Sequence, residues 1–267
     1  MRVEPDERLW RGWPGAASPG YARAFGERAQ DLDVDFRRPQ RAELVCALLH
    51  CCLRPRDGGW DGEETWSWTL AQRLQGLLAI ALASEIPTLA LVQRCRSCAE
   101  LLEVHVEAHA FVRDEGITEF EWAPGSGQIL RFALPTGREQ RAWSQTGDLT
   151  IDVMARQLIR GVDDLAPSAS WKFPEAWIDG LAQELERRDP LTALEIDTQC
   201  PACGVAASFE VDLEARLIGQ LYARQRKILA EIHRLASAYH WSETAILRLP
   251  AWRRRHYLAQ LGAAGTA

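Results

Sequence analysis

The sequence QCPACGVAASFEVD, from Gln199 to Asp212, contains two cysteines separated by two residues and followed by alternating apolar and polar residues. A CxxC spacing places two thiolates on one side of a tight turn, and alternation with a period of two predicts a β-strand. A structural zinc site has four ligands at the corners of a tetrahedron, so these cysteines supply only half of one. The other half must come from elsewhere in the chain.

A second CxxC, at Cys95 and Cys98, lies far upstream in a segment of the same kind. The sequence from Leu89 to Val112 alternates on both sides of this pair, which predicts a β-hairpin bent at the cysteines. CRSCAELLEVHVE and CPACGVAASFEVD align without a gap. We therefore expect the two hairpins to form a zinc ribbon with one structural Zn²⁺ per chain, held by Cys95, Cys98, Cys200 and Cys203.

Two other interpretations of these cysteines compete with zinc. Reduced thiols without metal in the two turns stay an alternative, because CRSCA lacks the Pro and Gly of CPACG. A thioredoxin-like redox pair is disfavoured, since that motif precedes a helix N-terminus that lowers the thiol pKa. Strands are predicted after both pairs here.

The composition of the chain limits its class and location. It has 267 residues, 47% of them hydrophobic, and a formal net charge of −6. The negative charge gives no global basic field for nucleic acid, so nucleic-acid binding is not expected. The opening MRVEPDERLW lacks an apolar core and no apolar run is long enough to cross a membrane, so we expect a cytoplasmic protein without membrane contact.

The hydrophobic pattern predicts an α+β fold with five parts. They are a poorly patterned N-terminal arm (1–40), N-terminal helices (41–88), the zinc ribbon (89–112 plus 191–212), an inserted mixed α/β segment (113–190) and C-terminal helices (213–261). In the N-terminal part, Arg41–Leu53 and Thr65–Ser84 are each predicted to form one helix.

The later segments allow more detailed predictions. A strand is expected over Ile129–Gln140, and helices are expected over Asp148–Val162 and Pro174–Arg188. Apolar residues at three-four spacing predict a long amphipathic helix from Leu213 to about His240. Ser242 is expected to cap a short helix, and Pro250 is expected to open the last one.

The other cysteines and histidines do not predict a second site. Cys46, Cys51 and Cys52 lie with His50 on an apolar helix, so we expect these cysteines only to pack as small hydrophobic residues. HVEAH, from His105 to His109, lacks the Glu that directly follows the first His of a metalloprotease helix. Its alternation instead puts His105, Glu107 and His109 on one solvated strand face.

No catalytic motif is present in the sequence. It contains no GxSxG, no P-loop and no GxGxxG, and its Ser, His and Asp residues are scattered. We therefore expect no enzymatic activity and no small-molecule substrate, although a site of unfamiliar form in the inserted segment is an open alternative.

The last predicted helix carries a run of arginines next to aromatic residues. A hook formed by the two short C-terminal helices is expected to expose Trp252, Tyr257 and Leu258 beside Arg253, Arg254 and Arg255. Aromatic residues and arginines are enriched at interface hot spots, so this set is a candidate partner-binding surface. The alternative is that the hook only caps the protein's own core.

The order of these features resembles a family of zinc-ribbon proteins encoded with the tails of T-even-type phages and contractile injection systems. The resemblance is most specific near the C-terminus, at the Leu235–Ala236 pair, Tyr239, Trp241, Ile246 to Leu249, Arg254, Arg255, Tyr257 and Leu258. A second element comprises Arg131, Leu134, Pro135, Thr136 and Gly137, although two residues rather than one separate its Arg from its Leu. The family has an acidic residue shortly after the Gly, where this chain has Arg138 and Glu139.

The resemblance covers about residues 41 to 261 and implies context rather than chemistry. Members of the family are described as baseplate hub assembly proteins or chaperones. It implies a non-enzymatic assembly factor or minor structural component that binds baseplate, hub or tail proteins. The alternative is a zinc-ribbon nucleic-acid-binding or transcription accessory protein, which is disfavoured because AELLEVHVEAHA and SFEVDLEA flank the cysteines with acidic residues.

Overall fold

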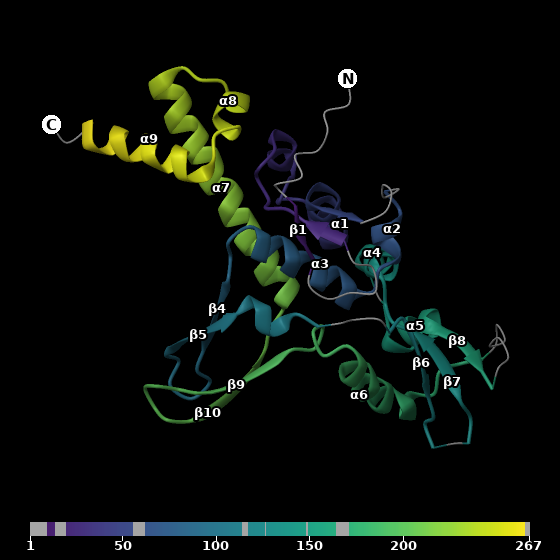
Figure 1. Cartoon of the computed structure of the whole chain (residues 1–267). Helices are drawn as coiled ribbons and strands as arrows, with labels where there is room; N and C mark the ends of the chain where they lie inside the picture. Colours follow the sequence, from purple (N-terminus) through teal and green to yellow (C-terminus); the bar gives the residue numbers. More distant parts are fainter. Residues whose placement is uncertain are drawn as a thin grey trace.

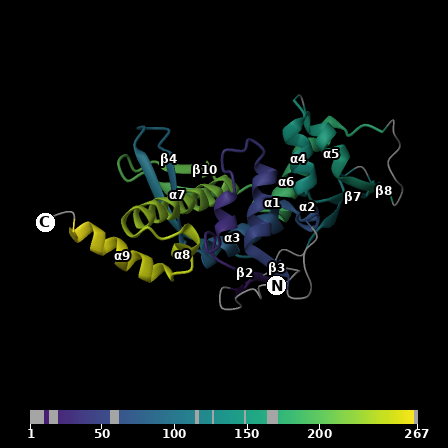
Figure 2. The ribbon, with the colours of Figure 1, turned by 90° about the horizontal axis from the view of Figure 1, so that it is seen from above.

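The computed structural model describes residues 10–13, 20–55, 62–113, 117–125, 127–147, 149–163 and 171–264. These residues form a mixed α/β structure in which a helical body carries three projections (Figure 1). Two cysteine hairpins lie on one side of the body and the inserted unit, residues 113–190, lies on the other, as the view from above also shows (Figure 2). A long C-terminal helix, α7, leads from the hairpins to a C-terminal hook, residues 240–264.

The helical body consists of α1 (Arg41–Cys52), α2 (Glu64–Ser67) and α3 (Leu70–Ala83). The prediction of one helix over Thr65–Ser84 was wrong, because the chain leaves the helical conformation at Trp68 and Thr69. Thr69 caps α3: its side chain accepts a hydrogen bond from the Gln72 amide, and the Gln72 side chain accepts one from the Thr69 amide. This reciprocal capping box satisfies two amides at a new helix start and so stabilises the break.

Residues 20–34 contribute to the core, which corrects the prediction that they belong to a poorly patterned arm. Strand β2 (Gly20–Ala22) pairs antiparallel with β1 (Arg11–Gly12) and with β3 (Leu53–Pro55), and a short 3₁₀ helix, η2 (Ala29–Asp33), follows. Phe25 is completely buried in the same core as α1 and α3. Residues 1–9 and 14–19 of the predicted arm lie outside the described residues.

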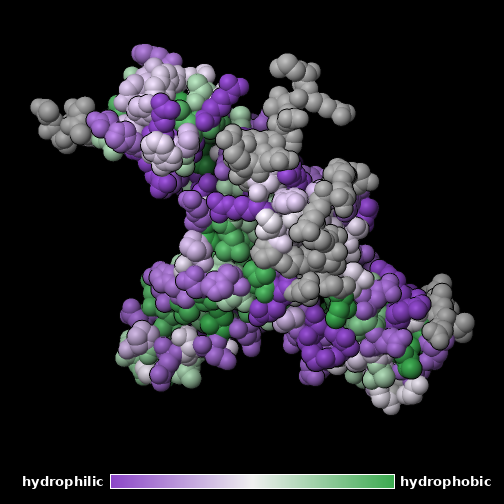
Figure 3. All heavy atoms as spheres, in the orientation of Figure 1, coloured by the Kyte–Doolittle hydropathy of each residue, from purple (hydrophilic) through white to green (hydrophobic). Residues whose placement is uncertain are grey.

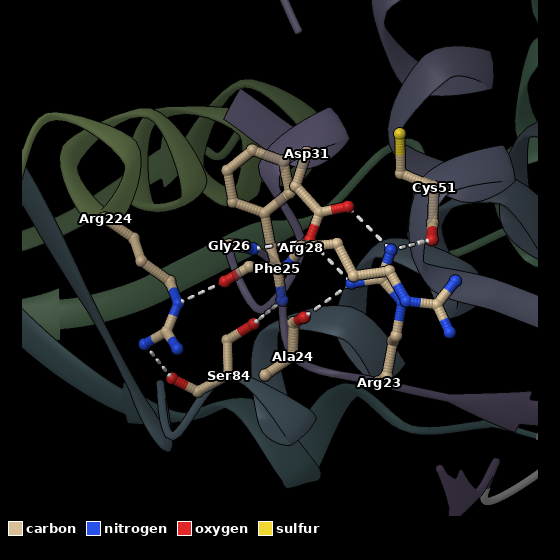
Figure 4. A network of polar contacts seen from close by, with 9 residues as sticks. All are labelled: Arg23, Ala24, Phe25, Gly26, Arg28, Asp31, Cys51, Ser84 and Arg224. Atoms are coloured by element: carbon tan, nitrogen blue, oxygen red, sulfur yellow. Dashed lines mark hydrogen bonds and ion pairs between the residues drawn. The ribbon is translucent and has the colours of Figure 1, made fainter. Parts of the chain in front are cut away.

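A buried ion pair holds residues 20–34, called the N-terminal lead-in below, in place (Figure 4). The side chains of Arg23 and Asp31 are 2% and 1% exposed, and two nitrogen–oxygen contacts of 2.6 Å join them. The amides of Gly26 and Arg28 also donate to Asp31, and Arg23 donates to the carbonyl of Cys51 on α1. The desolvation of two charges is offset by this bidentate geometry and the added hydrogen bonds, although Nε of Arg23 has no hydrogen-bond partner among the described residues.

The lead-in also contacts α3 and α7 through polar groups (Figure 4). The Phe25 amide donates to the hydroxyl of Ser84, and Arg224 on α7 donates to the carbonyls of Phe25 and Ser84. Residues 23–31 therefore join the start, middle and end of the chain in one core.

The cysteine hairpins are two separate antiparallel pairs of strands. Strand β4 (Thr88–Arg94) pairs with β5 (Leu101–Glu107), and β9 (Glu195–Gln199) pairs with β10 (Ala206–Glu210). Their inner faces pack on one another around Leu91, Phe209 and Val211. After β5 the chain turns into a 3₁₀ helix, η3 (Ala108–Phe111).

The inserted unit has its own hydrophobic core. Its sheet has the order β6-β7-β8 and is covered by helices. The elements are β6 (Glu119–Trp122), β7 (Leu130–Ala133), α4 (Gly137–Gln145), α5 (Ile151–Leu158), β8 (Ile159–Val162), η4 (Glu175–Trp177) and α6 (Ile178–Arg188). The predicted strand Ile129–Gln140 therefore ends early and gives way to α4, and the predicted helix Asp148–Val162 ends at Leu158 and gives way to β8.

The inserted unit joins the helical body at the segment Leu134–Gly137. The amide of Leu70 donates to Pro135 over 3.0 Å, and the amide of Gly137 donates to Trp68 over 3.1 Å. A Cβ at position 137 would overlap the guanidinium of Arg73, which is completely buried. A side chain at position 137 would have to displace this guanidinium from its acceptors on Cys46 and Thr65, so glycine is favoured where α4 begins.

The C-terminal helices agree with the sequence prediction. Helix α7 spans Leu213–Tyr239 and ends at His240, whose left-handed φ of 55° stops the helix. Ser242 caps α8 (Glu243–Leu247), and α9 (Ala251–Ala264) begins after Pro250. Among the described residues no helix combines the length and apolarity needed to cross a membrane.

Candidate metal centre

The two CxxC turns have matching backbone conformations. The amide of Cys95 donates to Glu100 over 2.8 Å and the amide of Cys200 donates to Val205 over 2.9 Å, which closes each hairpin. The residue after each second cysteine has a left-handed φ, 61° at Ala99 and 72° at Gly204. Gly204 suits this conformation, and Ala99 adopts it despite its Cβ. The missing Gly in CRSCA therefore does not change the turn.

The four cysteines of the two turns come together, as the sequence predicted. One thiol from each turn approaches one from the other: Cys95 Sγ lies 3.8 Å from Cys203 Sγ, and Cys98 Sγ lies 3.6 Å from Cys200 Sγ. All four sulfurs lie within 4.8 Å of one another. Cys95 and Cys200 are buried, whereas Cys98 and Cys203 are exposed, and none of them forms a disulfide.

The electrostatics of the cluster favour a bound cation. Hydrogen bonds from the Cys98 and Ser97 amides lower the pKa of Cys95 to about 7. The Glu100 amide acts in the same direction on Cys98, but desolvation and hydrogen bonding with the other three thiols raise the pKa of Cys98 to about 12. A thiolate close to other negative charges is disfavoured, and a positive charge among the sulfurs offsets that repulsion. A metal ion supplies that charge, and its binding displaces the thiol protons.

No family model, curated protein or solved structure matches the chain. The assignment of these four cysteines as a candidate metal site therefore rests on their spacing in the sequence and on the distances between their sulfurs.

The remaining cysteines lie away from the cluster. Cys46 and Cys52 are buried and Cys51 is partly buried. Cys46 does more than pack, because its Sγ accepts a hydrogen bond of 3.0 Å from Nη1 of the buried Arg73. Sequence patterning gave no sign of this contact, since Arg73 lies on an apolar helix face where a charged residue is unexpected.

A triple variant tests whether these three cysteines take part in metal binding. Changing Cys46, Cys51 and Cys52 to Ala is expected to lower stability, because Arg73 loses an acceptor and two buried side chains become smaller. The metal content measured by elemental analysis should stay at one ion per chain. A lower content in a folded triple variant would mean that the ligands are assigned wrongly.

The histidine segment lies on the surface, as predicted, but only two of its three residues lie on the predicted strand. His105 and Glu107 are exposed on one face of β5, and His105 Nε2 lies 3.1 Å from the carboxylate of Glu103. His109 is also exposed but lies in η3, beyond the end of the strand. Among the described residues, the metal-binding group consists of the four cysteines and includes neither histidine.

The candidate partner-binding residues divide between the surface and the hook core. Trp252, Arg253 and Arg255 are exposed. Arg254 is buried, donates to the Leu249 carbonyl over 2.7 Å and lies 3.5 Å from Glu231 on α7, so its expected exposure was wrong.

Tyr257 and Leu258 are the other members that turn inward. Both are partly buried against the core between α7 and α8. The ring of Tyr257 lies 5.0 Å from that of Trp241, which stacks on Tyr239 at 4.8 Å. These residues hold the hook together. Trp252, Arg253 and Arg255 remain exposed for a partner, and Arg253 also donates to the hydroxyl of Tyr257 over 3.2 Å.

Proposed function

We propose that the four cysteines hold one Zn²⁺ and that the hairpins around them form a zinc ribbon. Zn²⁺ binds four thiolates tetrahedrally at about 2.3 Å, which places the sulfurs about 3.8 Å apart. The separations of 3.8 and 3.6 Å fit this geometry. Protein ligands would fill all four positions, so the ion would have a structural role. When bound, it would link the two ends of the inserted unit.

The function supported best is that of a non-enzymatic assembly factor or minor structural component of a contractile-tail baseplate. The observation that carries it is the resemblance of two sequence segments to the zinc-ribbon family of contractile tails. In the fold, Leu134–Gly137 joins the inserted unit to the helical body, and the stretch from Leu235 to Leu258 builds the hook. Both segments lie where one part of the chain joins another. Their resemblance to the zinc-ribbon family therefore supports the proposal that this chain shares the family's architecture.

The exposed part of the hook is the proposed contact with a baseplate or hub protein. Trp252 is 66% exposed, more than any other large apolar side chain among the described residues. Arg253 and Arg255 lie beside it in the sequence and are exposed too. A solvent-exposed Trp flanked by arginines has the composition of an interface anchor for an acidic surface.

Co-purification from cells that carry the tail genes tests this function. Tagged full-length chain should capture baseplate or hub proteins, identified by mass spectrometry. The variant Trp252→Ala/Arg253→Glu/Arg255→Glu should lose at least about tenfold of that capture, since it removes the anchor and reverses two charges. Arg37→Glu/Arg38→Glu, which changes two exposed arginines distant from the hook in sequence, is the matched control and should retain it.

The outcomes separate the alternatives. Equal capture by both variants would place the docking surface elsewhere on the chain. Capture of nucleic acid or a transcription complex, without tail proteins, would favour the accessory role instead. That role has less support, because Glu103, Glu107, Glu195 and Glu210 are exposed on the hairpins and would repel phosphate.

A further inference from the structure

A continuous groove runs along one side of the cysteine hairpins. It consists of two cavities of about 400 and 290 Å³ that share Gln93 and Phe209 in their walls. The groove extends from Arg216 in the first turns of α7 to Arg96 in the first cysteine turn. Strand β4 lines one wall and β10 lines the other.

Backbone groups without a strand partner face the groove from β10. The hydrogen bonds from Cys200 to Val205 and from Val211 to Leu194 fix the pairing of β9 and β10. Because antiparallel pairs alternate, the amides and carbonyls of Ala206 and Ser208 point away from β9. No further strand pairs with this edge among the described residues.

The equivalent edge of β4 is partly covered. The bond from Cys95 to Glu100 sets the alternation there, so Val92 and Arg94 point their backbone groups away from β5. The side chain of Arg216 donates to the Val92 carbonyl over 3.3 Å, which agrees with that direction. The open edge is thus that of β10, which has neither Pro nor Lys to protect it.

The lining of the groove defines what would fit. Phe209, Leu91 and Leu102 are buried below it and give an apolar floor. Arg94 and Arg96 line the half near the cysteines, where the described lining has no carboxylate, whereas Glu210 and Asp212 line the half near α7. Hydrophobic residues also reach the surface over the hairpins (Figure 3), and Val205 at the groove is 47% exposed.

We propose that this groove binds an extended segment of a partner protein, which adds a strand to the edge of β10. The backbone of Ala206 and Ser208 would pair with the segment, its apolar side chains would contact the floor, and its carboxylates would contact Arg94 and Arg96. The occupant is therefore a strand of alternating apolar and acidic residues, with its carboxylates over the half that Arg94 and Arg96 line and away from Glu210 and Asp212. This site is separate from the hook and holds whether or not the partner belongs to a baseplate.

Panning a display library of random linear peptides on the full-length protein tests the proposal. Peptides that alternate apolar and acidic residues should be enriched. Their affinity for Ser208→Pro should fall at least tenfold, because proline removes the outward amide. The fold should survive, since that amide takes no part in the pairing with β9. Ser208→Ala keeps the amide and should bind like the natural protein, and equal metal content should confirm that both variants are folded.

Two further arms keep the test decisive if Ser208→Pro does not fold. An enriched peptide N-methylated at alternate residues should lose its binding, and Arg94→Glu/Arg96→Glu should weaken acidic peptides at least tenfold. Failure to enrich any alternating peptide, or undiminished binding of N-methylated peptides, would overturn strand addition. Enrichment of basic peptides would overturn the acidic character of the occupant.

Discussion

Replacing Cys200 with serine is expected to abolish metal binding and to unfold the cysteine hairpins. Cys200 is 1% exposed and lies 3.6 Å from Cys98 Sγ, so serine would leave three thiolates and a buried hydroxyl that is a poor zinc ligand. Metal binding in such sites is coupled to folding, and its loss should lower stability by several kcal/mol, on the order of the larger effects of single substitutions. Solubility should fall with metal content.

The measurement is hydrogen exchange combined with elemental analysis. In the Cys200→Ser variant, the amides of β4, β5, β9 and β10 should lose protection. The inserted unit, with its own core, should keep its protection. Cys51→Ser is the matched control, because Cys51 is a partly buried thiol outside the cluster, and it should keep both metal and hairpin protection. A Cys200→Ser variant that retains a full equivalent of metal would contradict the ligand assignment.

Replacing Asp31 with asparagine is expected to destabilise the protein by about 3–5 kcal/mol. The change leaves the guanidinium of Arg23 buried without a counter-charge. It also removes acceptor capacity from the amides of Gly26 and Arg28, and the new NH₂ group faces donors. The lead-in would then detach from α1 and α3.

Urea unfolding of Asp31→Asn beside Glu63→Gln measures this effect. Glu63 forms an exposed ion pair with Arg138, at 3.1 Å, and such pairs contribute about 0–1 kcal/mol. If Asp31→Asn lowers the free energy of unfolding by less than about 1 kcal/mol, the buried pair does not hold residues 20–34 in the core.

The features that the sequence predicted best repeat a simple pattern over many residues. Helix α7 ends within one residue of its predicted end, because apolar residues recur at three-four spacing along its whole length. Each cysteine pair lies in a short alternating segment that forms a hairpin, and the packing of the two hairpins on one another brings the four cysteines together. Ser242 and Pro250 mark helix starts by local chemistry that needs no tertiary contact.

The features that it missed depend on polar contacts between distant residues. Residues 20–34 have little hydrophobic periodicity, and the ion pair between Arg23 and Asp31 holds them in the core instead. The break at Thr69 depends on a capping box within an otherwise helical apolar pattern. Strand β8 follows α5 without a turn residue, so its apolar residues continue the helical pattern of α5 in the sequence. Arg254 looks like its neighbours in the sequence but faces α7.

Metal analysis of the purified full-length protein, combined with X-ray absorption at the zinc edge, tests the zinc ribbon most directly. One zinc per chain is expected, with four sulfur neighbours at about 2.3 Å and no nitrogen or oxygen neighbour. A protein that is folded without metal and has four titratable thiols at Cys95, Cys98, Cys200 and Cys203 would contradict it.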